Sequence, residues 1–203
     1  MPENSELERE KIGEGIEVFK YTKGNRRSYL IDKKILIDAG VPVKKDIKKL
    51  ILTHCHFDHI VYALKMRERT GCEIISSEKC AEHLRNMDEV VLKEEYRHRL
   101  KDEYHKIESF EVDRVVEEGD LINGLKVIET PGHTDGGISL YRRKDKVLFT
   151  GDTWFGNTVG RTDLPSSSDQ ALADSLKKLK SYDTKWICPG HGKIVKSEEI
   201  APD

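Results

Sequence analysis

Short runs of apolar residues, many of them alternating with polar ones, recur in both halves of the chain. A period of two is typical of β-strands. The segments 23–27 (KGNRR) and 32–34 (DKK) separate the first three runs as turns, which predicts antiparallel strands at the start of a sheet. The predicted strands are 16–21, 28–32, 34–40, 50–52, 72–77, 112–116, 125–130, 137–143, 146–152 and a last one that opens 185–192.

Two regions in the first half of the chain have helical features. Residues 60–71 carry apolar side chains at helical spacing, and Gly71 is a typical helix stop. Residues 79–108 are charged, lack Gly and Pro, and are rich in strong helix formers, which predicts a helical insertion of one or two helices. We expect the histidines of this insertion to be solvated helix residues and not ligands: His83, His98 and His105.

A further helix is predicted over residues 169–180. Ser167 and Gln170 have the spacing of a capping box, which marks the start of a helix. The apolar stripe of this helix consists of Leu172, Leu176 and Leu179. Strands and helices in this order predict an α/β (α+β) sandwich, in which two sheets carry helices on their outer faces.

Composition narrows the class of protein. The 203 residues, 36% of them hydrophobic, are enough for one core, so we expect a single domain over residues 1–203. The 35 basic and 37 acidic residues are interleaved, and the net charge is −2, so the sequence shows no basic segment that would indicate nucleic-acid binding. The high charged fraction and the single glutamine, Gln170, suit a thermophile.

Several patterns bear on localisation. The chain contains no run of 18 apolar residues, so no membrane span is predicted. Its first residues are charged and resemble no secretory signal. The four cysteines form no CxxC pair. We therefore expect a cytoplasmic protein with reduced thiols.

Residues 53–59, THCHFDH, crowd four ligand-type side chains into a short stretch. His54, His56 and Asp58 alternate, so in an extended segment they point the same way, and His59 follows where the chain turns into a helix. Two neutral imidazoles and a carboxylate suit zinc, or iron and manganese. The alternative is a histidine-rich surface loop, but a chance match to HxHxDH has odds of about one in a thousand.

Three later residues strengthen the metal hypothesis. His133 in PGHTDGG, Asp152 in FTGDT and His191 in PGHG each follow a predicted strand and lie close to glycine. Taken alone, each is typical of an ordinary loop residue. Together with residues 54–59 they supply enough ligands for two metal ions.

The motifs THCHFDH, PGHTDGG, FTGDT and PGHG, in that order, resemble the metal motifs of the metallo-β-lactamase superfamily. The resemblance runs from about Val18 to Ile194 and implies an αββα sandwich with the site at one edge of the sheets. Residues 159–165 (VGRTDLP) resemble the glyoxalase II and persulfide dioxygenase branch of the superfamily. Cys55, between the first two histidines, resembles the THCHADH form of the motif in persulfide dioxygenases.

The resemblance also implies a set of ligands for two divalent metal ions, with zinc favoured and iron or manganese as alternatives. His54, His56 and His133 would bind the first ion, and Asp152 would bridge the two. The residues implied for the second ion are Asp58, His59 and His191.

These observations favour a metal-dependent hydrolase that acts on a small-molecule thioester or similar activated acyl substrate through a metal-bound hydroxide, which Asp58 orients. One alternative is a persulfide dioxygenase with a single iron at His54, His133 and Asp152. Another is a metal-binding protein without catalysis. The oligomeric state is left open.

Two further residues are candidates for substrate binding. Arg161 could clamp a substrate carboxylate or pair with Asp163. Tyr62 could roof the site or pack against the core. Cys55 is expected to be a buried spacer, because it lies between two residues that face the metal.

Overall fold

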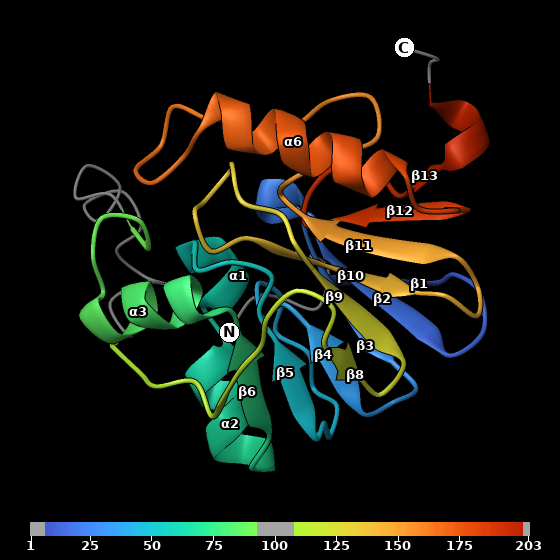
Figure 1. Cartoon of the computed structure of the whole chain (residues 1–203). Helices are drawn as coiled ribbons and strands as arrows, with labels where there is room; N and C mark the ends of the chain where they lie inside the picture. Colours follow the sequence, from blue (N-terminus) through green and yellow to red (C-terminus); the bar gives the residue numbers. More distant parts are fainter. Residues whose placement is uncertain (1–6, 93–107, 201–203) are drawn as a thin grey trace.

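Two mixed β-sheets pack face to face in the computed structural model, which describes residues 7–92 and 108–200 (Figure 1). The first sheet has the strand order β1-β2-β3-β4-β5-β6-β7. Its strands β1 to β4 are antiparallel, and β4 to β7 are parallel. The bounds are β1 Leu7–Lys11, β2 Ile16–Tyr21, β3 Arg26–Ile31, β4 Ile35–Ile37, β5 Lys49–Ile51, β6 Glu73–Ser76 and β7 Arg114–Val115.

The second sheet has the order β13-β12-β11-β10-β9-β8. All its neighbouring strands are antiparallel except β11 and β12, which the crossover helix α6 (Asp169–Lys180) connects. The bounds are β8 Leu121–Ile122, β9 Leu125–Glu129, β10 Ile138–Arg142, β11 Val147–Gly151, β12 Trp186–Pro189 and β13 Val195–Lys196.

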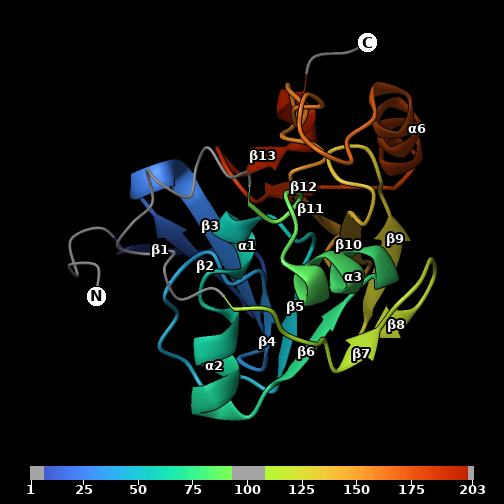
Figure 2. The same ribbon diagram turned by 90° about the vertical axis from the view of Figure 1, so that its left-hand side faces the viewer.

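Three α-helices lie on the side of the first sheet that faces away from the second (Figure 2). Two short 3-10 helices complete the described elements, one after β2 and one at the end of the described chain. The bounds are α1 Phe57–Ile60, α2 Ala63–Thr70, α3 Glu78–Asn86, η2 Lys23–Asn25 and η3 Ser197–Glu199.

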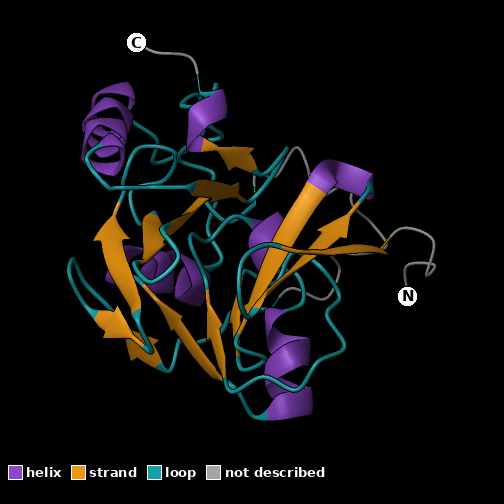
Figure 3. Cartoon of the chain, turned by 90° about the vertical axis from the view of Figure 1, so that its right-hand side faces the viewer, coloured by secondary structure: helices purple, strands orange, loops and turns teal. Residues whose placement is uncertain are grey.

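Side chains along each strand point alternately to the two faces of its sheet, so the buried residues form three separate hydrophobic clusters. In β5, Leu50 packs in the cluster under α1 to α3, while Ile51 packs in the cluster between the sheets. The third cluster lies between the second sheet and α6, where Leu179 contacts side chains of the sheet. The layers are therefore helix, sheet, sheet and helix, as the ribbon coloured by secondary structure shows (Figure 3).

The predicted sandwich is confirmed, and most element positions agree with the hydrophobic pattern. Three short strands, β1, β8 and β13, were not predicted. The helix predicted over residues 60–71 forms as two helices, α1 and α2, and the first begins earlier, at Phe57. Gly71 ends α2 as predicted, in the left-handed conformation with φ 65°.

The predicted insertion over residues 79–108 is helical at its start. Helix α3 ends at Asn86, residues 87–92 form no helix, and residues 93–107, with His98 and His105, lie outside the described residues. The prediction that His83 is solvated is wrong, because its side chain is 13% exposed and contacts Asp88 and Asp135.

The prediction that Ser167 caps α6 is wrong, and the N-cap lies one residue later. Ser168 is the N-cap, and its hydroxyl accepts a hydrogen bond from the Ala171 N–H at 3.3 Å. The hydroxyl of Ser167 instead donates to the carbonyl oxygen of Leu164 at 2.5 Å, within the loop before the helix. Within residues 7–92 and 108–200, no helix combines the length and apolar character needed to cross a membrane.

Candidate metal centre

The seven side chains that the sequence singles out gather at one edge of the two sheets. His54 and His56 follow β5 of the first sheet, and Asp58 and His59 belong to the short helix α1. The other three follow strands β9, β11 and β12 of the second sheet: His133, Asp152 and His191. The site therefore forms where strands of both sheets end.

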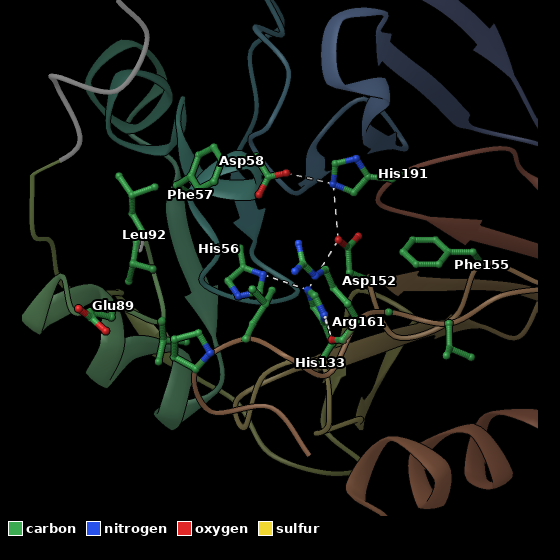
Figure 4. A pocket seen from close by; sticks show the side chains of 16 residues that line it. His56, Phe57, Asp58, Glu89, Leu92, His133, Asp152, Phe155, Arg161 and His191 are labelled. Atoms are coloured by element: carbon green, nitrogen blue, oxygen red, sulfur yellow. Dashed lines mark hydrogen bonds and ion pairs between the residues drawn. The ribbon is translucent and has the colours of Figure 1, made fainter. Parts of the chain in front are cut away.

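His54, His56 and His133 form one group of possible metal ligands. One nitrogen from each ring lies within 4.8 Å of the others. His133 Nε2 is 2.9 Å from His56 Nδ1, so these two rings present those atoms to a shared point (Figure 4).

Asp58, His59 and His191 form a second group, again within 4.8 Å. His191 Nε2 lies 3.2 Å from His59 Nε2 and 3.1 Å from Asp58 Oδ2. Asp152 lies between the groups, with Oδ1 3.4 Å from His59 Nε2 and Oδ2 3.8 Å from His133 Nε2. A third group of possible ligands, His54, His59 and Asp152, overlaps the other two. The structure therefore brings all seven side chains together, and their assignment to two separate ions stays a prediction.

A carboxylate behind the cluster orients two of its histidines. Asp38 Oδ2 lies 2.8 Å from His59 Nδ1 and accepts a 2.8 Å hydrogen bond from the Thr53 hydroxyl, and Oδ1 accepts from the Thr53 N–H at 2.7 Å. Because the Thr53 hydroxyl donates to Asp38, it accepts from His54 Nδ1 at 3.0 Å. Nε2 of His54 and of His59 is then left with a lone pair for a ligand.

Backbone carbonyls orient two further histidines in the same way. His133 Nδ1 donates to the Arg161 carbonyl oxygen at 2.8 Å, and His191 Nδ1 donates to the Gly24 carbonyl oxygen at 3.0 Å. Each ring therefore keeps Nε2 for the cluster. Sequence reasoning missed Asp38 and Thr53, although an aspartate directly after strand β4 and a threonine before the first histidine were the available signals.

Burial and mutual charge set the protonation of the cluster. Burial and the neighbouring His133 lower the pKa of His56 to about 3. Burial, together with His59, also lowers the pKa of His54 well below its ordinary value. Both rings are therefore neutral at physiological pH, which is the form that binds a metal ion.

The two carboxylates of the cluster stay ionised. Burial opposes the charged form, but the hydrogen bond with His191 and the nearby His59 bring the pKa of Asp58 below its ordinary value. Against the same effect of burial, His191 and His59 lower the pKa of Asp152. Burial lowers the pKa of His59 and of His191, but Asp152 and the other nearby carboxylates outweigh it and raise both pKa values, so these two rings release a proton when they bind an ion. Ionised carboxylates and neutral imidazoles are ligands for divalent cations.

The cluster fits metal ions on two structural grounds. His54 Nε2 and Asp152 Oδ1 are buried and have no hydrogen-bond partner in the described chain, which is costly unless a ligand satisfies them. The backbone at Gly190 lies so close to the cluster that a Cβ there would overlap His59 Cε1 and Asp152 Oδ1.

The other three candidate residues differ in whether they line the cavity above the cluster or pack in the core. Arg161 lines the cavity above the cluster and forms the expected two-point ion pair with Asp163, whereas its role in clamping a substrate carboxylate stays a prediction. Tyr62 packs against the core under the helices and does not line this cavity. Cys55 is fully buried in the same core, as expected of a spacer.

A two-sheet sandwich with histidines and aspartates of both sheets gathered at one edge defines a metal-binding protein of the metallo-hydrolase class. The chain belongs to the metallo-β-lactamase superfamily, whose model matches residues 21–191.

Known relatives cover most of the chain. A probable metallo-hydrolase of Methanocaldococcus jannaschii is 35% identical over 82% of this chain and 87% of the relative. Hydroxyacylglutathione hydrolase GloC of Haemophilus influenzae is 32% identical over 72% of this chain and 69% of its own. The solved structure of TTHA1623 in a di-iron-bound form has 25% identity and a TM-score of 0.72, covering 85% of this chain and 90% of the other.

Proposed function

We propose that this protein is a metal-dependent hydrolase that cleaves thioesters or similarly activated acyl compounds. The observation that carries the proposal is the pair of ligand groups, joined by Asp152, at the floor of a cavity. His54, His56 and His133 would hold one ion, and Asp58, His59 and His191 the other. Two bound divalent ions supply Lewis acidity, which activates water at neutral pH and polarises an acyl carbonyl.

The protein's own residues position the reactants. Asp58 lines the cavity and remains ionised, so its carboxylate can accept a hydrogen bond from the attacking water and orient it. The water oxygen forms the new bond to the acyl carbon, the carbon–sulfur bond breaks, and the products are a carboxylic acid and a thiol. No serine or cysteine nucleophile is required, and buried Cys55 takes no part.

The runner-up function is an iron-dependent persulfide dioxygenase. It requires one iron at His54, His133 and Asp152, and these three are not one of the ligand groups within 4.8 Å in the described residues. The three groups that do form share His54 and His59 and together contain seven ligand-type side chains, more than one ion needs, which favours two ions. Zinc and iron are both compatible with imidazole and carboxylate ligands.

The deciding experiment compares zinc-loaded and iron-loaded protein. Thiol release from thioesters is measured under nitrogen, and oxygen uptake is measured with glutathione persulfide in air. The hydrolase proposal predicts thiol release by the zinc form, because hydrolysis needs no redox step. Oxygen uptake by the iron form, with no thioester cleavage by either form, would establish the dioxygenase instead.

A further inference from the structure

The cavity above the metal cluster has a polar floor and largely apolar walls. Its volume is about 610 Å³, within the range of small-molecule sites. The residues of the metal cluster form the floor, and eight apolar residues, two charged residues and one glycine form the rest of the lining. The floor consists of His56, Asp58, His133, Asp152 and His191.

One wall lies on the Asp58 side of the cluster and comes from α1 and the segment after α3. In Figure 4, Phe57 and Leu92 lie together on this side. The Phe57 N–H donates to the Val91 carbonyl oxygen at 2.9 Å, which fixes the two segments to each other. The apolar residues of this wall are Phe57, Val90, Val91 and Leu92.

A second wall comes from the loop between β11 and α6. Phe155 lies beyond Asp152 and His191 in the same view. A β-bridge pairs Trp154 with Val159, and the Val159 side chain remains 45% exposed at the cavity. The apolar residues of this wall are Phe155, Val159, Leu164 and Pro165.

The charged groups of the walls do not suit a strongly anionic ligand. Among the described lining residues, Arg161 is the one with a permanent positive charge. Its Nε and Nη2 donate to the carboxylate oxygens of Asp163 at 2.7 and 2.6 Å, so a neighbouring anion already balances it. Glu89 adds an exposed carboxylate to the first wall.

We infer that the substrate is an uncharged thioester with apolar groups on both sides of the scissile bond, and that glutathione thioesters are poor substrates. This inference rests on the proposed function. A carbonyl at the cluster directs one arm of the substrate onto each apolar wall. A glutathione arm carries two carboxylates and one ammonium group, which would exchange water for Phe, Val and Leu side chains, and among the described lining residues only Arg161, already paired with Asp163, is a permanent cation.

The apolar walls give a quantitative expectation for chain length. Each methylene that leaves water for an apolar surface contributes about 0.8 kcal/mol when fully buried, which corresponds to about a fourfold gain. The walls differ in exposure, since Val90 and Leu92 are 8% and 6% exposed and Val159 is 45% exposed. A methylene on them is only partly buried, so we expect roughly a two- to fourfold gain in kcat/KM per methylene until the wall is filled.

The test compares acetyl, butyryl and hexanoyl thioesters of N-acetylcysteamine with hexanoylglutathione, using zinc-loaded protein. Here kcat/KM should rise along the acyl series, and the hexanoyl thioester of N-acetylcysteamine should exceed hexanoylglutathione by at least about tenfold, the factor for 1.4 kcal/mol. Equal or faster cleavage of hexanoylglutathione would overturn the inference while leaving the hydrolase proposal intact.

Two exposed apolar residues provide a variant and its matched control. Val159→Ser removes an apolar side chain from the second wall, whereas Leu121→Ser removes one that is 68% exposed on β8, outside the cavity lining. Val159→Ser should lower kcat/KM for the hexanoyl thioester about three- to tenfold and reduce the gain per methylene, whereas Leu121→Ser should change neither. An unchanged chain-length gain in Val159→Ser would contradict the assigned wall.

A binding measurement separates this inference from the proposed function. Calorimetric titration of zinc-loaded protein with hexanethiol and with glutathione requires no catalysis. Tighter binding of hexanethiol, without cleavage of any thioester, would retain the apolar ligand class and remove the hydrolase proposal. Tighter binding of glutathione would overturn the inference whatever the activity.

Discussion

At the scale of single residues, the metal centre depends on side chains behind the ligands as much as on the ligands. Asp38 accepts hydrogen bonds from both the backbone and the side chain of Thr53 and orients His59. Through Thr53 it also orients His54. This carboxylate therefore determines which nitrogen two of the histidines present to an ion.

Replacing Asp38 by Asn should weaken zinc binding by about 10- to 100-fold, the usual effect of losing such a partner. The amide would place N–H groups against donors that Asp38 now satisfies. Chelator competition measures the affinity, and Asp46→Asn is the control, because the Asp46 side chain is 96% exposed on the surface. Equal affinities of Asp38→Asn and wild type would show that Asp38 does not orient the ligands.

Replacing Asp152 by Ala should lower metal content and activity more than replacing Cys55 by Ser. Asp152 lies between the two ligand groups, whereas Cys55 is buried in the core. A hydrogen bond with Cys80, together with burial, raises the pKa of the Cys55 thiol, so it is no thiolate ligand. A loss of bound metal in Cys55→Ser as large as in Asp152→Ala would contradict this assignment.

At the scale of elements, contacts of helix α3 hold the segment that forms the first cavity wall in place. His83 on α3 lies 2.6 Å from Asp88 and 2.8 Å from Asp135. Asp88 precedes the wall residues Val90–Leu92, and Asp135 follows His133. The histidine therefore joins the wall segment to the loop that carries the candidate ligand His133.

This contact predicts a pH dependence of stability. Burial lowers the pKa of His83, but hydrogen bonds with Asp88 and Asp135 outweigh it and raise the pKa. The stabilisation is therefore fully present below the ordinary histidine pKa of about 6.5 and is lost as pH rises through the raised value in the folded state. Urea unfolding should show a larger difference between wild type and His83→Gln at pH 5.5 than at pH 9. The reverse trend would contradict the contact.

The elements that were predicted and those that were missed differ in what stabilises them. Strands such as β2 and β5 bury side chains, so their sequence shows the hydrophobic pattern. Strand β1, LEREK, is mostly exposed and is held by backbone pairing with β2, which leaves no pattern to detect. Ser167 and Ser168 both have a capping hydroxyl, and the loop geometry decides between them.

The site was predictable to the extent that its chemistry is local. The HxHxDH spacing and the glycine-flanked His133 and His191 identify ligand-type residues from sequence alone. The role of Asp38 and the composition of the two cavity walls arise from contacts between segments distant in the chain. The sequence shows an aspartate directly after a strand at position 38, but one sequence does not identify which distant residues it contacts.

At the scale of the whole molecule, the candidate metal ligands come from both sheets. The first ligands follow β5 in one sheet, and the last three follow β9, β11 and β12 in the other. Ions bound by both sets would therefore cross-link the sandwich at its edge. Ligands that bind the folded state and not the unfolded chain raise its stability by mass action.

Zinc should consequently raise the thermal midpoint of unfolding, and chelation should lower it. Free zinc at about 1,000 times its dissociation constant would contribute about 4 kcal/mol per site. Scanning calorimetry at several zinc concentrations measures the shift, with Asp152→Ala as the variant that should respond less. A midpoint independent of zinc would show that no ion links the sheets.

We expect the seven clustered side chains to form a site for two ions. Elemental analysis of protein purified without metal and then reconstituted tests it most directly. The structure predicts saturation close to two transition-metal ions per chain, because both ligand groups and the aspartate between them are in place. Saturation at one ion would favour the mononuclear iron alternative, and saturation at zero would contradict the metal centre altogether.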